Sequence, residues 1–112
     1  MPRPKKPRYV QGPPIANMFI PNICPPFGRG QVILPIEGYE AIRLVDFEGM
    51  DQEEAAKMMN VSRQTFGRIL AEARAAVAEA LVMGKVLRIE GGNFVFPPFG
   101  GHRHRWRWRG GF

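Results

Sequence analysis

The sequence predicts a small, mainly α protein: a three-helix helix-turn-helix domain with a C-terminal β-hairpin and an extended, proline-rich N-terminal arm. Three observations support this fold class. Nine of the 11 prolines lie within residues 1–35, where they prevent a helix of any length. Apolar residues recur at helical spacing through residues 36–83. Gly91 and Gly92 then separate two short runs with strand character, which is a strong hairpin pattern.

Length and composition limit the class of protein. A chain of 112 residues suffices for one domain, and 45% hydrophobic with 23% charged residues is ordinary for a globular protein. No apolar run approaches the roughly 20 residues that a membrane span needs, and no secretory signal is evident. We therefore expect a cytoplasmic protein with no membrane partner. The single cysteine, Cys24, excludes an internal disulfide and a multi-cysteine zinc site.

Three regions are predicted along the chain. Residues 1–35 form the basic arm, whose apolar side chains we expect to pack against a core. Residues 36–99 form the helix-turn-helix domain with its hairpin. Residues 100–112 form an Arg/Trp/Gly-rich tail that we expect to be disordered. A short strand is predicted at Gln31–Leu34, ending at Pro35.

Positive charge is concentrated at the two ends. The net charge is +6, yet the first eight and the last eleven residues carry eight of the 16 basic residues, which leaves the rest at −2. Basic arms of this kind bind polyanions, and nucleic acid is the commonest specific partner. The N-terminal residues predicted to contact DNA phosphates are Arg3, Lys5, Lys6 and Arg8. In the tail, Trp106 and Trp108 alternate with arginines and suit stacking on bases, so RNA is a further candidate partner.

The first two helices are predicted from their apolar faces and their end signals. The first spans residues 36–47 and stops at Gly49. The second opens at Asp51, an N-cap with Glu54 three residues on, and runs to Met59. Its inward residues are Ala55, Ala56 and Met59.

The third helix is the longest. Ser62 is a good N-cap, and the helix continues to Met83, before Gly84. Its apolar residues recur at helical spacing: Phe66, Ile69, Leu70, Ala73, Val77 and Leu81.

The second and third helices have the spacing of a DNA-binding helix-turn-helix. Ala56 is small where the two axes approach, Asn60 tolerates left-handed backbone in the turn, and Val61 fills the corner. Phe66 then packs the third helix onto the second. In this motif the second of the two helices enters the major groove by its N-terminal end.

A helical wheel places polar and small residues opposite Phe66. Four of them are predicted to meet base edges: Gln64, Gly67, Arg68 and Ala71. Among these, Gln64 suits hydrogen bonding to adenine and Arg68 to guanine. Gly67 and Ala71 have small side chains, which lets the helix sit deep in the groove. Three more are predicted to contact phosphates from the flanks and the helix start: Ser62, Arg63 and Thr65.

Other classes of function are weighed against DNA binding. Amphipathic helix pairs also occur in all-α proteins that never touch DNA. The chain could be an RNA-binding accessory protein that uses its basic ends, or an interaction module of the transcription machinery. An enzyme is not expected, because no catalytic constellation or phosphate loop is present. No metal or cofactor is expected either, since His102 and His104 lie among arginines. The acidic residues Glu48, Asp51, Glu53 and Glu54 could suggest paired catalytic carboxylates, but they lie at a helix start, where the macrodipole explains them.

Three stretches resemble a known family. They are PRPKKPR at the start, EAIRLVDFEGMDQEEAAKMMNVSRQTFGRILAEARAAVAEAL in the middle and GKVLRIEGGNFVF after it. The chain is similar to the uncharacterised protein family 0251, also called domain of unknown function 134, whose members are predicted DNA-binding proteins of bacteria and archaea. The resemblance implies a helix-turn-helix similar to region four of sigma factors, with Arg63, Gln64, Thr65 and Arg68 in the reading helix. Gly38 departs from the helix-forming residue expected there, which leaves the start of the first helix open.

The C-terminal strands are expected to support a dimer. Val86–Glu90 and Asn93–Phe96 form the predicted hairpin. Because an isolated hairpin is only marginally stable, we expect it to pair with Gln31–Leu34. The sheet and the long third helix would then form a homodimer interface, so that two reading helices meet half-sites about one helical turn apart. The sequence therefore predicts a sequence-specific regulator of transcription that binds double-stranded DNA.

Overall fold

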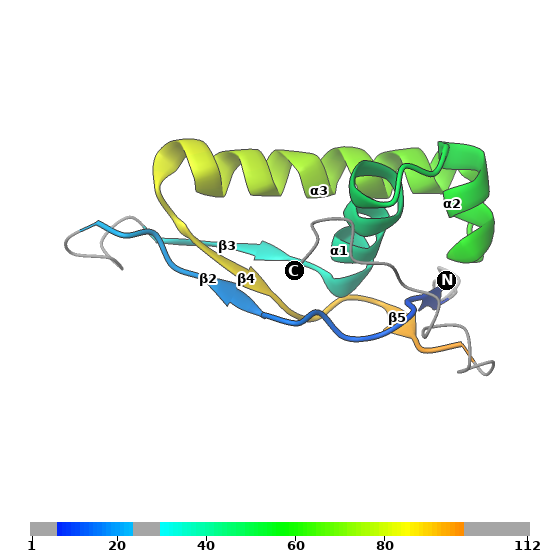
Figure 1. Cartoon of the computed structure of the whole chain (residues 1–112), viewed down its shortest axis with the longest axis horizontal. Coiled ribbons are helices and arrows are strands. Elements are labelled where there is room, and N and C mark those ends of the chain that lie inside the picture. The colour runs from blue at the N-terminus through cyan, green and yellow to red at the C-terminus, as the bar shows by residue number, and fades with distance from the viewer. Residues whose placement is uncertain (1–6, 24–29, 98–112) are drawn as a thin grey trace, which may run out of the picture.

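The computed structural model describes residues 7–23 and 30–97. The helices lie on one side of the molecule, and short strands run beneath the longest of them (Figure 1). The chain is mainly α with a smaller β part, as predicted. The elements in order are β1 (Arg8–Tyr9), β2 (Met18–Phe19), β3 (Gln31–Leu34), α1 (Ile36–Ile42), the π-helical η1 (Arg43–Phe47), α2 (Gln52–Met58), α3 (Arg63–Met83), β4 (Val86–Ile89) and β5 (Phe94–Val95).

The end signals of α2 and α3 are confirmed. Asp51 accepts a 2.8 Å hydrogen bond from the Glu54 amide, and Ser62 accepts a 3.0 Å bond from the Thr65 amide. Each bond satisfies an amide that the first helical turn leaves without a partner. α3 ends at Gly84, whose φ of 68° is the left-handed conformation that favours glycine.

The predicted first helix has the expected bounds but two geometries. α1 begins at Ile36, and from Arg43 the chain continues as the π-helical η1. Gly38 is a point of close approach between α1 and its neighbours. A Cβ there would lie 3.0 Å from Leu34 Cδ1 and 3.2 Å from Ala73 Cβ. Glycine therefore allows the start of α1 to pack against β3 and α3.

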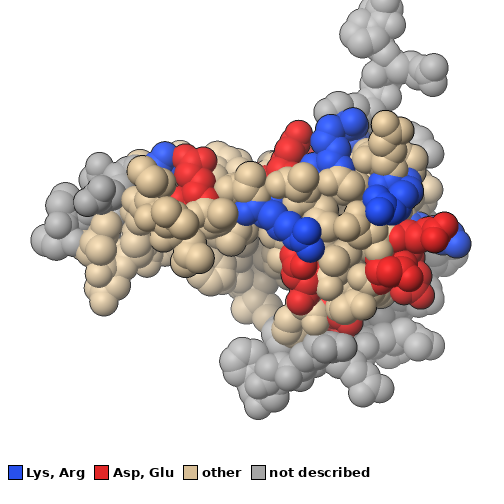
Figure 2. Space-filling model, turned by 90° about the horizontal axis from the view of Figure 1, so that it is seen from above, with Lys and Arg blue, Asp and Glu red and all other residues tan. Residues whose placement is uncertain are grey.

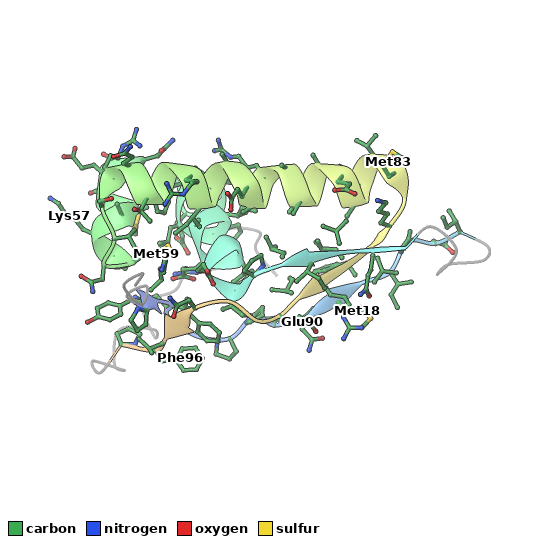
Figure 3. All side chains as sticks on the ribbon, turned by 180° about the vertical axis from the view of Figure 1, so that it is seen from behind. Met18, Lys57, Met59, Met83, Glu90 and Phe96 are labelled. Carbon is green, nitrogen blue, oxygen red and sulfur yellow. The ribbon has the colours of Figure 1, made fainter. Side chains whose placement is uncertain are left out.

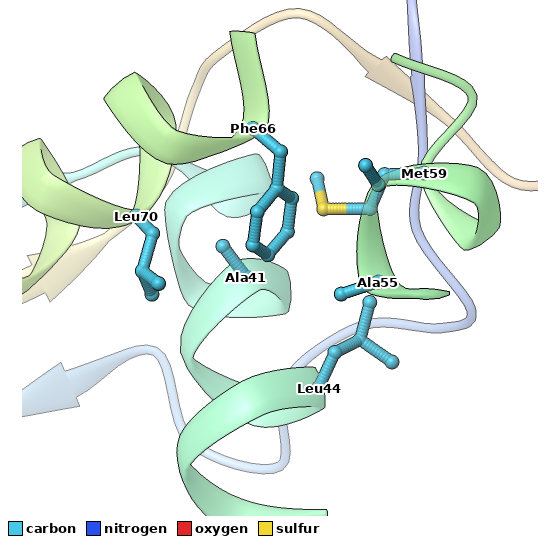
Figure 4. Packing of buried hydrophobic residues seen from close by; sticks show 7 residues of the cluster. Ala41, Leu44, Ala55, Met59, Phe66 and Leu70 are labelled. Atoms are coloured by element: carbon cyan, nitrogen blue, oxygen red, sulfur yellow. The ribbon is translucent and has the colours of Figure 1, made fainter. Parts of the chain in front are cut away.

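The three helices share one hydrophobic core. Figure 4 shows the Phe66 ring of α3 pointing between Ala41 of α1 and Met59, which caps α2. Phe66, Met59 and Ala55 are fully buried, and Leu70 is 2% exposed. The small alanines bring the helix axes together around the ring, and Phe66 contributes the largest side chain of the cluster. Replacing such a phenylalanine by alanine typically costs about 3–5 kcal/mol.

A second core cluster joins the N-terminal segment to the rest of the fold. It contains Val10, Leu34, Ile36, Ala73 and Ile89, from five different parts of the chain. The expectation of an extended arm therefore needs correction for residues 7–23, because Val10 is fully buried and β1 pairs with β5. The apolar residues of the arm were also expected to pack against a core, but Ile15, Phe19 and Ile20 are 75%, 55% and 50% exposed.

The sheet confirms one predicted pairing and overturns another. β3 runs parallel to β4, with Val32 opposite Leu87, as expected for the 31–34 strand. β2 pairs with the other edge of β4. The predicted hairpin is wrong: β4 and β5 do not pair, and β5 instead runs parallel to β1.

The loop after β4 explains why no hairpin forms. The Ile36 amide donates to the Gly91 carbonyl at 3.0 Å, and the Asn93 amide donates to Glu37 Oε1 at 3.0 Å. These bonds dock the loop on the start of α1. Gly91 and Gly92 have φ values of 75° and 104°, and a Cβ at Gly92 would collide with the Glu37 carboxylate. The two glycines therefore direct the chain onto the helix instead of reversing it.

A buried ion pair holds the N-terminal segment, α1 and η1 together. Glu40 is 1% exposed and Arg43 is 7% exposed, and two 2.9 Å bonds join the guanidinium to the carboxylate. Glu40 Oε2 also accepts the Gln11 amide at 3.2 Å, and Arg43 Nη1 lies 3.3 Å from Glu48. Removing one partner of a buried ion pair is strongly destabilising. In the ranges 7–23 and 30–97, no helix is both long and apolar enough to cross a membrane.

We predict that Glu40→Gln lowers the free energy of unfolding by about 3–5 kcal/mol, because Arg43 then loses the buried carboxylate charge that binds it through two bonds. The matched control is Glu90→Gln. Glu90 pairs with Arg88 at 3.1 Å on the surface, where such a pair contributes at most about 1 kcal/mol. Urea denaturation followed by circular dichroism measures both. Equal losses in the two variants would contradict the structural role of the buried pair.

Candidate nucleic-acid interface

The turn between α2 and α3 sets the direction of α3. Asn60 has φ of 60°, which confirms the left-handed conformation expected there. Its amide donates to the Lys57 carbonyl, and the Val61 amide donates to the Ala56 carbonyl at 3.0 Å. The side chain of Val61 packs against the helix core. The N-terminal segment is bonded to the same turn, since the Tyr9 amide donates to the Met59 carbonyl at 3.0 Å.

The predicted reading residues lie together on the first half of α3. Phe66 and Leu70 face the core. The exposed ones are Ser62, Arg63, Gln64, Arg68 and Ala71, and the half-buried ones are Thr65 and Gly67. Ser62 and Thr65 are joined by a 3.0 Å bond between their hydroxyls as well as by the cap. The exposed residues form one continuous face, which we call the α3 face.

Gly67 shows that α2 contributes to the same surface. A Cβ at Gly67 would lie 3.4 Å from Arg63 Nη1 and 3.9 Å from Gln52 Oε1. Gln52 is the first residue of α2, and the sequence analysis did not select it. The sequence could have indicated Gln52 only through its position as the first helical residue after the Asp51 cap. In Figure 3, Lys57 also projects from α2 away from the core.

Charges on this part of the molecule differ in how far they are neutralised. Within the described ranges, Arg63 and Arg68 make no ion pair. Farther along α3, Arg74 binds Asp46 of η1 through two bonds, Nη2–Oδ1 at 2.7 Å and Nε–Oδ2 at 3.1 Å. These hydrogen bonds lower the pKa of the Asp46 carboxyl and raise the pKa of Arg74. Arg74 therefore ties α3 to η1, whereas the two arginines nearer the helix start can bind another group.

The folded part is not strongly basic. Figure 2 looks onto the side that carries α3. Basic and acidic patches alternate on the half where α2 and the start of α3 lie, and the other half is mostly uncharged. Half of the 16 basic residues fall outside the described ranges, among them Arg3, Lys5 and Lys6. On the described α3 face, a polyanion could bind two neighbouring arginines, Arg63 and Arg68, but no broad basic surface.

Several predicted residues lie elsewhere. Arg8 is only 7% exposed, in β1, so its guanidinium is not available as a phosphate contact on a free arm. The following lie outside the described residues: Arg3, Lys5, Lys6, Cys24, His102, His104, Trp106, Trp108 and the 100–112 tail. In the described part, no three His, Cys, Asp or Glu side chains gather as a metal site. Of the acidic residues near α2, Asp51 acts as its N-cap.

Comparison with known proteins identifies the family. The profile described as "Protein of unknown function DUF134" matches residues 1–96, a range that contains every element of the fold. The chain belongs to the DUF134 family. The resemblance expected from the sequence is thereby confirmed at the level of the family.

Three similar proteins share the name UPF0251 protein. One from Caldanaerobacter subterraneus subsp. tengcongensis is 49% identical over 113 residues, covering 96% of each chain. One from Thermoanaerobacter pseudethanolicus is 53% identical over 94 residues, covering 84% of this chain and 80% of the relative. One from Chlorobaculum tepidum is 45% identical, covering 85% of this chain and 48% of the longer relative. No solved structure matches the chain.

The pair between Asp46 and Arg74 predicts how stability depends on pH. The folded state lowers the pKa of Asp46. Its contribution is therefore complete above the unfolded-state pKa of about 3.9 and is lost as the pH falls through the lower folded value. At neutral pH we expect Asp46→Asn to cost at most about 1 kcal/mol, because the pair is exposed. The difference from the wild type should vanish in acid.

Urea denaturation at a series of pH values measures this dependence. Glu72→Gln is the control, since Glu72 is an exposed carboxylate of α3 with no ion pair among the described residues. A stability difference for Asp46→Asn that persists below the pKa of the carboxyl would contradict the role assigned to the pair.

Proposed function

We propose that the protein is a sequence-specific double-stranded DNA-binding protein of the cytoplasm that regulates transcription. In this proposal α2, the Asn60 turn and α3 act as a helix-turn-helix, and the first half of α3 lies in the major groove. One observation carries the proposal. Burial of Phe66 and Leu70 leaves Gln64 and Arg68 exposed on the same helix, with no ion pair at Arg68 among the described residues.

The chemistry of the α3 face suits base edges. An arginine can donate two parallel hydrogen bonds to O6 and N7 of guanine, and a glutamine can bond N6 and N7 of adenine. Arg68 and Gln64 are separated by four residues and therefore by about one helical turn. Gly67 and Ala71 add little bulk beside them, so the helix backbone can approach the bases closely.

Phosphate contacts would orient the helix in the groove. The start of α3 presents backbone amides beyond the one that Ser62 caps, and such amides bind anions. Arg63 lies next to them and is exposed. Arg3, Lys5 and Lys6 remain in the proposal on the strength of their charge, which supplies affinity that falls as salt rises. Arg8 is omitted because it is buried.

A homodimer would place two copies of α3 on one DNA site. Leu81 was expected to face the core, but it is 80% exposed, because α3 extends past the core beyond Ala80. Val82 and Met83 are 78% and 52% exposed. Figure 3 shows Met83 at the far end of α3 from α2 and Lys57. α3 is about 30 Å long at 1.5 Å per residue, so a dimer contact at this end leaves the α3 face open.

We predict that selection from random DNA duplexes yields a shared motif for the wild-type protein. Gln64→Ala and Arg68→Ala should each weaken binding to that motif by about 1–3 kcal/mol and relax the preference at one position. Fluorescence anisotropy at fixed salt measures the affinities. The matched control is Arg88→Ala, which removes an arginine of β4 paired with Glu90 and should leave both affinity and preference unchanged.

Two outcomes would contradict DNA readout. One is the absence of any shared motif together with tighter binding to single-stranded RNA, which would favour the RNA-binding alternative. The other is unchanged binding in both alanine variants.

We predict that Leu81→Lys dissociates the dimer, because a lysine would place its charge in the proposed apolar contact. Analytical ultracentrifugation measures the mass, and Ala75→Lys is the control, at an exposed position of α3 on a different face from Leu81. A wild-type protein that sediments as a monomer at micromolar concentration would contradict the dimer. DNA binding through a single half-site would remain possible, so this test is separate from the selection.

A further inference from the structure

A cavity lies between the sheet, α1–η1 and the N-terminal segment. Its volume is about 510 Å³. Leu87 lines it from β4, Ile42 and Phe47 from α1 and η1, and Val77 from α3; Ala16 lines it from the segment before β2. Ile42, Val77 and Leu87 pack against the two core clusters, whereas Ala16 is exposed. The cavity is separate from the α3 face.

The size of the cavity is that of a ligand site. The cavity opens to solvent, because its lining side chains Ile15, Phe19 and Phe47 are 75%, 55% and 37% exposed. Small-molecule sites commonly measure about 300–1,000 Å³ and are lined mostly by apolar groups with a few polar ones. This cavity falls within that range.

Two of its described lining residues are polar, and they differ in the hydrogen bonds that they can make to a ligand. Arg43 is bound by Glu40 through two bonds and by Glu48 through a third, so its charge is already neutralised. The Tyr39 hydroxyl makes no hydrogen bond to any described residue. Burial raises the pKa of Tyr39 above its ordinary value, so the hydroxyl stays protonated at neutral pH. It can donate one hydrogen bond and accept another.

We propose that this cavity binds a small, neutral, largely apolar molecule that carries one polar group hydrogen-bonded to the Tyr39 hydroxyl. A charged ligand is disfavoured because burying an unpaired charge among apolar side chains is costly, and Arg43 has no unshared charge to offer. The apolar body of the ligand contacts Ile42, Val77 and Leu87. This proposal is independent of DNA binding.

Occupation of the cavity acts on the element that also supports the helix core. Ile42 and Phe47 contact the ligand, and Leu44 between them is 1% exposed in the cluster that holds Phe66. Asp46 of the same segment binds Arg74 of α3. A bound ligand therefore stabilises η1 against α3 and raises the melting temperature, with a stabilisation that grows as the logarithm of the ligand concentration once that concentration exceeds the dissociation constant.

The test uses the full chain and the neutral fluorescent probe N-phenyl-1-naphthylamine, which has an apolar body and one N–H group. We expect saturable binding of one probe per chain and a rise in melting temperature. Ala16→Trp and Val77→Phe fill the cavity from two different elements, and each should weaken binding at least tenfold. Ala78→Trp adds the same bulk at an exposed position of α3 outside the lining and should leave the affinity unchanged.

The polar contact has its own test. Tyr39→Phe should weaken probe binding about threefold to tenfold, as expected for one hydrogen bond. The anionic probe 1-anilinonaphthalene-8-sulfonate should bind at least tenfold more weakly than the neutral one. Circular dichroism checks that each variant is folded.

Three results would overturn the proposal. The first is unchanged affinity in both cavity-filling variants. The second is one probe bound per two chains, which would indicate that a second copy forms the site. The third is a tenfold gain in affinity when Trp106 and Trp108 are both replaced by serine in the full chain, which would indicate that the tail competes for the cavity.

Discussion

The packing of Phe66 is the constraint on which the account depends. The ring is fully buried in the cluster formed by the three helices, and Leu70 lies beside it one turn later. Each residue advances a helix by about 100°, so burial of these two side chains fixes the rotation of α3 about its own axis. Rotation by one residue would expose the ring and bury a polar neighbour, at a cost of several kcal/mol. The outward direction of Gln64 and Arg68 follows from this packing.

The β part fixes the position of the helix core from the other side. The buried Glu40–Arg43 pair, the Gln11 amide and the 91–93 loop all meet α1 and η1. They hold the segment that supplies Leu44 to the Phe66 cluster and Asp46 to Arg74. The same arrangement leaves the apolar cavity between η1 and the sheet. The strands therefore help to position the helices that carry the α3 face, although no strand residue is part of that face.

Local signals predicted the helices well and the β connections only in part. Caps such as Asp51 and Ser62 act within four residues, and a helical wheel placed the polar face of α3 opposite Phe66. The prediction of a hairpin at Gly91 was wrong because the Asn93 amide donates to Glu37, which lies 56 positions earlier in the chain. Burial of Arg8 follows from its pairing with distant β5. Gln52 was missed because a pattern within one helix does not show which residue of another helix lies beside it.

The most direct measurement of the central claim is chemical-shift mapping of the ¹⁵N-labelled full chain during titration with a DNA duplex. We predict that the largest changes occur at amides 62–71, on the outward side of α3, with smaller ones at Gln52 and Lys57. The amides of β4 and of residues 77–80 should change little. Changes centred on the sheet or the cavity, with residues 62–71 unaffected, would contradict the assignment of the α3 face as the surface that binds DNA.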